Sequence, residues 1–341
     1  EFRSLGPIEP FDQVRPMGAE QSNSSVVLDE RVVLKAYRRL GAGPNPELEI
    51  LHFLTHRGFP HIAALRGYYQ HTGRLIDATL GIVQDFLRGA VDGWDLALAD
   101  LQEDPGRFVP RAHALGEVTG RLHYTLGSDP HDPAFAPEET SVESLGLLTA
   151  TVDEEIEQLF LDMPDLEALL PLRGRGEEVR DRLRQLTQVG SAGRIIRHHG
   201  DFHLGQTMLT PDGGWVVLDF EGEPARTLVE RRRKRSPLRD VAGMLRSFAY
   251  AATASKLVHD RPAPAGWESQ VREAYLDGYL AETDQSLLPP GRQAIERLLA
   301  VFELEKAIYE LRYEIDNRPD WVRIPVAGIA RLLELESEET P

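Results

Sequence analysis

The opening quarter of the chain alternates apolar and polar positions as β-strands do, and the rest repeats apolar positions at helical spacing. A helix is predicted to interrupt the strand-rich part, because Asn45 is a suitable N-cap and Pro46 suits the first helical turn. From Trp94 onward the spacing predicts helices almost throughout. Strand-like runs are predicted at residues 25–28, 31–37, 64–69 and 78–86.

This pattern predicts a small, mainly β part over residues 1–88 and a large, mainly helical part over residues 89–341, which together form an α+β fold. A chain of 341 residues is long enough for two domains or for one large two-lobed unit. The acidic triplet 153–155 is interpreted as a solvated helix face. Long helices are predicted at residues 111–126, 144–170, 176–189, 267–282, 290–316 and 325–336.

Composition narrows the range of partners. The chain has 38 basic and 55 acidic side chains, and its formal charge of −17 argues against nucleic acid or an anionic membrane as the main partner. No apolar run is long enough to span a bilayer, and no signal-peptide pattern is visible. The chain contains no Cys, which excludes disulfides and thiolate chemistry, and a cytoplasmic location is the default expectation.

The stretch 199–221 carries the candidate chemistry. Phosphoryl transfer needs a carboxylate to accept the proton of the acceptor hydroxyl, a side-chain amide on a metal ion, and a second carboxylate on the metal. The tripeptide His-Gly-Asp that ends at Asp201 matches the start of the kinase pattern H-R-D-x-x-x-x-N, and Gln206 stands at the offset of its Asn. Asp219 follows a short apolar run, as the metal-binding aspartate of D-F-G does. A β-hairpin is expected to bring Asp219 back beside Asp201.

Two other interpretations of this stretch are open. His-Gly-Asp can be a simple turn, with Asp219 merely ending a strand. Alternatively His199, Asp201, His203 and Asp219 can be the ligands of a metal used for hydrolysis. The rest of the chain favours phosphoryl transfer over both.

A polar loop near the N-terminus is a candidate phosphate loop. Residues 15–25 lack the Gly-Lys-Ser/Thr of a Walker A motif. A small polar loop between two strands can nevertheless cover phosphates with its backbone N–H groups and hydroxyls. Ser22, Asn23 and Ser24 are therefore candidate nucleotide contacts, although a surface turn is the commoner meaning of such a stretch.

Lys35 is the candidate phosphate-binding lysine. It lies in the β-branched run 31–37, which is similar to the V-A-I-K strand whose Lys contacts ATP phosphates and a helix Glu. A lone Lys in a strand is more often a solvated edge residue. Glu47 or Glu49 of the following helix should reach Lys35, and because they point to different helix faces the sequence does not choose between them.

Residues 84–87 follow the last predicted strand and stand where a kinase hinge would contact adenine. Gln84 and Phe86 are therefore candidate adenine contacts, although an ordinary core strand would have the same sequence pattern. The basic run 230–235 is interpreted as a solvated loop or as a lip that attracts a nucleotide. Behind it, Arg239 and Asp240 are expected to brace the catalytic loop.

The helix over residues 303–314 is the candidate acceptor site, because carbohydrate sites need planar hydrogen-bonding groups and aromatic faces. The alternative is an exposed helix stabilised by ion pairs between successive turns. His203 of the catalytic loop is assigned to the same substrate side. The candidate contacts fall mostly on one side of the helix: Glu305, Lys306, Tyr309 and Tyr313.

With these residues in order, the chain resembles the aminoglycoside-phosphotransferase-like kinases and, within them, the actinobacterial maltokinases. The resemblance implies a bilobal protein-kinase-like fold that uses ATP and Mg²⁺ to convert maltose to maltose 1-phosphate for α-glucan synthesis. It implies that Asp201 is the base, that Lys35 holds phosphates, and that Gln206, Asp219 and Glu221 hold Mg²⁺. The stretches that carry it are residues 18–25, 199–206, 219–226, 236–246 and 303–324.

Two departures from the maltokinase pattern are visible. Maltokinases usually carry a cap subdomain before the phosphate loop, and because little precedes that loop here we expect an upstream part to be missing. Ala249 stands where an acid is expected. The acceptor is therefore expected to be maltose or a related sugar, with trehalose synthase as a candidate partner. The rivals are a glucosamine or aminoglycoside kinase and a nucleotide-binding pseudokinase or scaffold.

Overall fold

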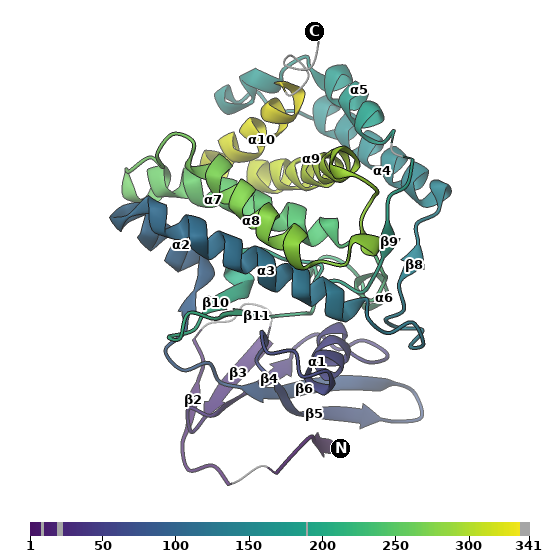
Figure 1. Cartoon of the computed structure of the whole chain (residues 1–341), viewed down its shortest axis with the longest axis vertical. Helices are drawn as coiled ribbons and strands as arrows, with labels where there is room; N and C mark the ends of the chain where they lie inside the picture. The colour runs from purple at the N-terminus through teal and green to yellow at the C-terminus, as the bar shows by residue number, and fades with distance from the viewer. Residues whose placement is uncertain (8–9, 19–22, 189, 335–341) are drawn as a thin grey trace.

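A six-stranded antiparallel sheet forms the N-terminal part of the molecule (Figure 1). The computed structural model describes residues 1–7, 10–18, 23–188 and 190–334. The chain turns tightly between the third and fourth strands because Asp29 and Glu30 both adopt positive φ, and the Arg31 N–H donates to the Leu28 carbonyl at 2.9 Å. The strand order is β1 (Phe2–Ser4), β5 (Leu65–Thr72), β6 (Asp77–Asp85), β4 (Val32–Tyr37), β3 (Asn23–Leu28) and β2 (Val14–Pro16).

Helix α1 (Pro46–His56) lies beside this sheet in Figure 1. The Asn45 side chain caps it by accepting the Glu47 N–H at 2.8 Å. Its apolar face, which includes Leu51 and Leu54, is buried, so the polar residues between them project from other sides of the helix.

Helices build the remainder of the molecule. Helices α3 and α8 approach so closely that a Cβ added to Gly116 would lie 2.0 Å from the Tyr275 carbonyl oxygen. The longer helices are α2 (Gly93–Glu103), α3 (Phe108–Leu126), α4 (Val142–Leu161), α5 (Gly176–Leu186), α7 (Leu238–His259), α8 (Trp267–Glu282), α9 (Arg292–Asn317) and α10 (Arg323–Glu334). The short ones are α6 (Leu228–Arg231), η1 (Pro105–Arg107), η2 (Glu167–Leu172), η3 (Leu204–Gln206), η4 (Gln285–Leu287) and η5 (Pro319–Trp321).

A small antiparallel sheet lies between these two parts and carries the catalytic stretch (Figure 1). A further two-stranded sheet joins β8 (Glu138–Glu139) to β9 (Arg194–Ile195). The hairpin of the small sheet returns the chain so that Leu218 N–H donates to the Gln206 carbonyl at 2.9 Å. The small sheet has the order β11 (Trp215–Val217), β10 (Thr207–Leu209) and β7 (Val91–Asp92).

The α+β class and the four predicted strand runs agree with the structure, which has β3, β4, β5 and β6 at those positions. The helix predicted over residues 144–170 is too long, because α4 ends at Leu161. Pro164 lacks a backbone N–H and its ring would clash with the preceding turn, so a helix that continues through it is strongly disfavoured. Within the described residues, no helix is both long and apolar enough to cross a bilayer. The domain boundary after residue 88 stays a prediction.

Candidate active site

The loop that carries Asp201 is anchored by the buried carboxylate of Asp240 in α7. That carboxylate accepts the His199 N–H at 2.7 Å and the Gly200 N–H at 2.9 Å. On the other side, His199 Nε2 donates to the Leu218 carbonyl oxygen at 2.7 Å. Asp240 thus braces the loop as predicted, whereas Arg239 pairs with Glu305 of α9 at 2.8 Å. The His199 imidazole ties the loop to the residue that precedes Asp219.

The turn after β11 is shaped by two residues in the left-handed region. Asp219 has φ 56° and Gly222 has φ 73°, and a non-glycine residue in this conformation commonly marks a functional constraint. Between them Phe220 is buried, with its ring centroid 5.0 Å from that of His199. The apolar anchor leaves the carboxylates of Asp219 and Glu221 free to reach the β part.

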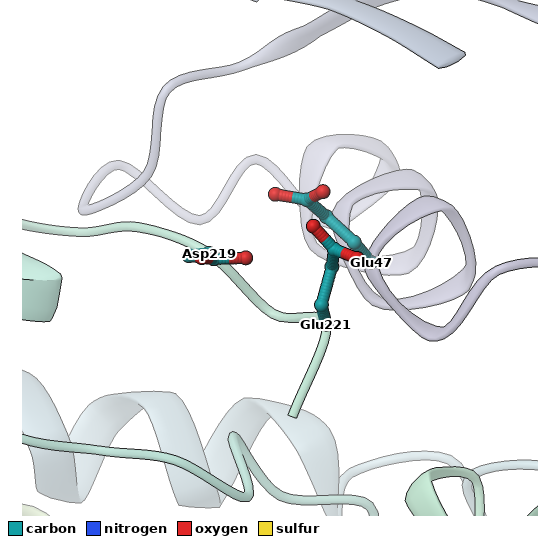
Figure 2. Close-up of side chains that lie close together, drawn as sticks. All are labelled: Glu47, Asp219 and Glu221. Carbon is teal, nitrogen blue, oxygen red and sulfur yellow. The ribbon is translucent and has the colours of Figure 1, made fainter. Parts of the chain in front are cut away.

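The ammonium group of Lys35 contacts three carboxylates. Its Nζ lies 3.0 Å from Glu47 Oε2, 3.0 Å from Asp219 Oδ1 and 2.9 Å from Glu221 Oε1. Figure 2 shows the carboxylate of Glu47 projecting from α1 toward those of Asp219 and Glu221. The Asn23 side-chain amide also donates to Glu221. Residues far apart in the sequence therefore meet at one buried cation, which is 6 % exposed.

Burial and neighbouring charges oppose one another in this cluster, and the outcome differs between its members. Burial lowers the pKa of Lys35, but the three carboxylates outweigh it and hold that pKa well above its ordinary value. Burial raises the pKa of Asp219, but Lys35 outweighs it and holds that pKa below its ordinary value. Burial raises the pKa of Glu47 to about 7 despite the nearby ammonium.

The structure distinguishes the two helix acids. Glu47 contacts Lys35 and also accepts the Tyr37 hydroxyl at 2.8 Å. The Glu49 carboxylate instead binds Arg197 at 3.1 Å and both Nε and Nη2 of Arg232, at 2.7 and 2.6 Å. The alternative in which Glu49 reaches Lys35 is therefore wrong, because the two acids leave α1 in different directions.

Three cavities meet around these residues. The first, which we call the β-side cavity, has an empty volume of about 1160 Å³. Lys35 and Glu47 form part of its wall, and the predicted hinge residues Gln84 and Phe86 form another part. Its apolar surface comes from side chains on both sides: Met17, Val33, Ala63, Leu87, Met208 and Leu218.

The middle cavity adjoins the β-side cavity, since Gln206 and Asp219 line both. It has an empty volume of about 1750 Å³ and is also lined by Asn23 and Glu221. The Ser24 hydroxyl is not part of this lining and accepts Arg38 Nε at 3.0 Å. The candidate contact at position 22 lies outside the described residues.

The helical cavity adjoins the middle cavity, since Asp201 lines both. It has an empty volume of about 880 Å³, and Glu305, Lys306 and Tyr309 of α9 contribute to its wall. Lys306 Nζ lies 3.7 Å from Asp201 Oδ1. Burial lowers the pKa of Lys306, but Asp201 and Glu310 outweigh it and raise that pKa. Lys306 is therefore a cation held beside the Asp201 carboxylate in the helical cavity.

Two predicted substrate residues lie away from this wall. Tyr313 is 46 % exposed and is absent from the described lining of the helical cavity; its ring lies 5.4 Å from the Arg318 guanidinium. His203 is absent from the described lining of all three cavities. Burial lowers the pKa of His203, which favours its neutral form.

Sequence reasoning missed part of the helical cavity. Glu155, interpreted as a member of a solvated face, is half-buried and lines this cavity. Arg231 and Arg235 line it as well, although the basic run was interpreted only as a loop or lip. The signal available was the position of that run shortly after Asp219, which keeps it close to the catalytic residues.

The candidate metal ligands fit Mg²⁺ in part. Glu47, Asp219 and Glu221 each offer an oxygen within 4.8 Å of the others, but the Lys35 ammonium already contacts all three. Gln206 and Asp219 line both the β-side and the middle cavity and carry the oxygen atoms that Mg²⁺ prefers. These two residues are therefore the better candidates for a metal held between the cavities.

Comparisons with known proteins fit this geometry. A glucosamine kinase of Streptacidiphilus jiangxiensis is 26% identical over 336 residues, covering 95% of this chain and 74% of the relative. A glucosamine kinase of Mycolicibacterium smegmatis is 28% identical over 338 residues, covering 94% of this chain and 79% of the relative. No protein-family model matches the chain.

Solved structures define the fold. A glucosamine kinase structure superposes with a TM-score of 0.83 at 23% identity, covering 98% of this chain and 81% of the other. A choline kinase from Cryptosporidium parvum superposes with a TM-score of 0.52 at 14% identity, covering 96% of this chain and 89% of the other. The GDP complex of aminoglycoside 2'-phosphotransferase-IIIa superposes with a TM-score of 0.51 at 15% identity, covering 96% of this chain and 94% of the other. The chain therefore has the kinase-like fold that these phosphotransferases share.

Proposed function

We propose that this protein is an ATP-dependent sugar kinase whose acceptor is glucosamine or a closely related amino sugar. The observation that carries the proposal is the position of Asp201, which lines both the helical cavity and the cavity beside Gln206 and Asp219. A carboxylate at such a junction can contact an acceptor hydroxyl on one side and face a nucleotide phosphate on the other.

The two curated relatives support the choice of acceptor. Both are glucosamine kinases, and each aligns with nearly the whole of this chain. They favour an amino sugar over maltose, which the sequence resemblance implied, and they lend no support to trehalose synthase as a partner. Maltose remains a comparison acceptor in the experiment below.

ATP and Mg²⁺ would occupy the β-side and middle cavities. A glucosamine kinase of the same fold has been solved with glucosamine, ADP and inorganic phosphate, which supports ATP as the phosphoryl donor here. Gln84 and Phe86 would contact the adenine, and Lys35 would face the phosphates. Gln206 and Asp219 would hold Mg²⁺, which neutralises the charge of the phosphates when bound.

Asp201 would perform the acceptor half of the reaction. Its carboxylate orients the sugar hydroxyl and accepts its proton as the oxygen attacks the γ-phosphorus. A new P–O bond forms to the sugar, and the bond from the γ-phosphorus to the leaving oxygen of ADP breaks. The Lys306 ammonium, 3.7 Å from Asp201 Oδ1, lines the same cavity and would also face the acceptor.

An acceptor panel tests this function. Purified protein is incubated with Mg-ATP and either glucosamine, glucose, maltose or an aminoglycoside, and release of ADP is measured together with the mass of the product. We expect glucosamine-dependent ADP release and a glucosamine phosphate. A folded protein that binds Mg-ATP but phosphorylates none of these acceptors would instead fit the scaffold hypothesis.

A further inference from the structure

The basic run 230–235 contains residues with different surroundings. Arg232 binds Glu49, and Lys234 binds Glu138 and the Pro133 carbonyl. These two side chains therefore have structural partners. Arg233 is exposed and is absent from the described lining of the three cavities. The run as a whole is thus not a uniform solvated loop.

Arg231 has a different position, at the end of α6 where the helical and middle cavities meet. Along with Asp201 and Gly222, it lines both of them. Arg231 packs beside Gly222, where an added Cβ would lie in ordinary contact, 3.6 Å from the Arg231 Cβ and Cγ atoms. A group bound across the two cavities would therefore lie beside a carboxylate and a guanidinium.

The Arg231 guanidinium is held by neutral partners. Its Nε donates to the Arg226 carbonyl oxygen at 2.9 Å, and its Nη2 donates to the Pro224 carbonyl oxygen at 3.0 Å. In the part of the chain that the structure describes, no carboxylate lies within ion-pair distance of this guanidinium. The two carbonyls fix its direction and leave its charge available to a ligand.

We propose that Arg231 is a catalytic residue that binds the phosphoryl group during its transfer from the nucleotide to the acceptor. This proposal rests on the proposed kinase function and adds a residue to it. Charge on the transferring group is spread over its three equatorial oxygens, and a planar guanidinium can bind two such oxygens at once.

The surroundings explain why a cation is needed at this position. Lys35 is enclosed by Glu47, Asp219 and Glu221, so its charge is largely balanced before any nucleotide binds. The charge that develops nearer the acceptor faces the Asp201 carboxylate, which repels it. Arg231 at the same junction offsets that repulsion. It neither gains nor loses a proton, while Asp201 accepts the proton of the acceptor hydroxyl.

Kinetics of Arg231 variants provide the first test. We expect Arg231→Ala to lower kcat about 100-fold, since loss of one positioned charge donor commonly costs that much, with KM for ATP and for the acceptor within about threefold. Arg231→Lys should retain more activity than Arg231→Ala, and added guanidine should restore part of the Arg231→Ala rate. Arg233→Ala is the matched control from the same run and should behave as wild type.

A binding measurement separates this role from a purely structural one. Arg231 also braces the 224–226 loop, and Arg231→Gln keeps an N–H donor for those carbonyls without the charge. Aluminium fluoride added to Mg-ADP mimics the phosphoryl group in transfer. We expect it to raise the melting temperature of wild type but not of Arg231→Ala or Arg231→Gln, while Mg-ADP alone binds all three proteins equally.

Three results would overturn the proposal for Arg231. They are a kcat of Arg231→Ala within threefold of wild type, an unchanged aluminium fluoride response, and loss of Mg-ADP binding together with activity. The melting-temperature measurement needs no acceptor. It therefore tests Arg231 even if wild type phosphorylates none of the sugars, a result that would count against the proposed function alone.

Discussion

The cations on the β side and on the helical side of the candidate site differ in their carboxylate partners. On the β side, the Lys35 ammonium is buried and contacts three carboxylates from α1 and the 219–221 turn. On the helical side, neither Arg231 nor Arg235 has a carboxylate partner among the residues that the structure describes. Burial and the charges of Arg239 and Arg226 lower the pKa of Arg235 to about 10.

This difference separates a preformed framework from a surface that needs a ligand. Arg231 and Arg235 are partly buried cations beside a cavity, and a cation there without a carboxylate partner favours a ligand that supplies the missing negative charge. The Lys35 cluster needs no ligand to fix its geometry. Substitutions in the helical cavity, by contrast, should change binding and turnover of nucleotide and acceptor more than they change the stability of the free protein.

The largest expected effect comes from breaking the β side. Lys35→Met leaves Glu47, Asp219 and Glu221 without their shared cation, and removing one partner of a buried ionic group commonly costs about 3–5 kcal/mol. We expect a comparable fall in the free energy of unfolding, measured with denaturant, and loss of nearly all turnover. Lys256→Met is the control, because Lys256 pairs with Asp260 on the surface. A stable and active Lys35→Met protein would contradict this assignment.

The two acids of α1 sharpen the comparison. Glu47→Gln removes a direct partner of Lys35, so we expect kcat/KM for ATP to fall about 100-fold. Glu49→Gln leaves the buried Arg197 without its carboxylate partner, which should lower stability, but it does not touch Lys35, so we expect kcat/KM for ATP to fall by less than about tenfold. Steady-state kinetics at varied ATP concentration gives kcat/KM for both variants. Equal losses would mean that the position of α1 matters as much as the ion pair.

His198, on the helical side, predicts a dependence of stability on pH. Burial lowers its pKa to about 3 in the folded protein, from 6.5 ordinarily. Between these values the unfolded chain binds more protons, so stability falls as the pH falls below 6.5. The contribution is about 1.4 kcal/mol per pH unit for one group.

The test compares wild type with His198→Gln by denaturant unfolding between pH 7 and pH 5. We expect a shallower loss of stability in the variant, and we expect His113→Gln, which replaces an exposed imidazole, to follow wild type. Parallel curves for wild type and His198→Gln would show that His198 is not the source of the dependence.

The smallest expected effect concerns the acceptor wall. Tyr309 lines the helical cavity, whereas Tyr313 on the same helix does not belong to its described lining. Tyr309→Ala should raise KM for glucosamine about fivefold, as loss of about 1 kcal/mol of aromatic contact would do, and leave KM for ATP unchanged. Tyr313→Ala is the matched control. A larger effect of Tyr313→Ala would move the acceptor site along α9.

The β side was largely predictable from the sequence, because its chemistry lies in short local patterns. The spacing of Gln206 and Asp219 follows from one loop and one hairpin, and Lys35 lies in a recognisable strand. The choice between Glu47 and Glu49 was not predictable. It depends on how α1 is rotated against the sheet, which tertiary packing decides.

The helical side was much harder to predict. Its wall combines side chains from α4, α6, α7 and α9, which meet only in the folded chain. Glu155 has the local sequence of a solvated face, yet it lines the cavity. Arg231 and Arg233 stand two positions apart in one basic run, and only the structure distinguishes the cavity residue from the exposed one.

Replacement of Asp201 tests the central claim most directly, because this carboxylate lines both the helical and the middle cavity. Single-turnover transfer from Mg-ATP to glucosamine is measured for wild type, Asp201→Asn and the surface control Asp212→Asn, with Mg-ADP binding measured in parallel. We predict that Asp201→Asn lowers the rate of phosphoryl transfer by at least about 100-fold and keeps nucleotide binding. Asp212→Asn should transfer at the wild-type rate. Transfer at the wild-type rate by Asp201→Asn would contradict the account.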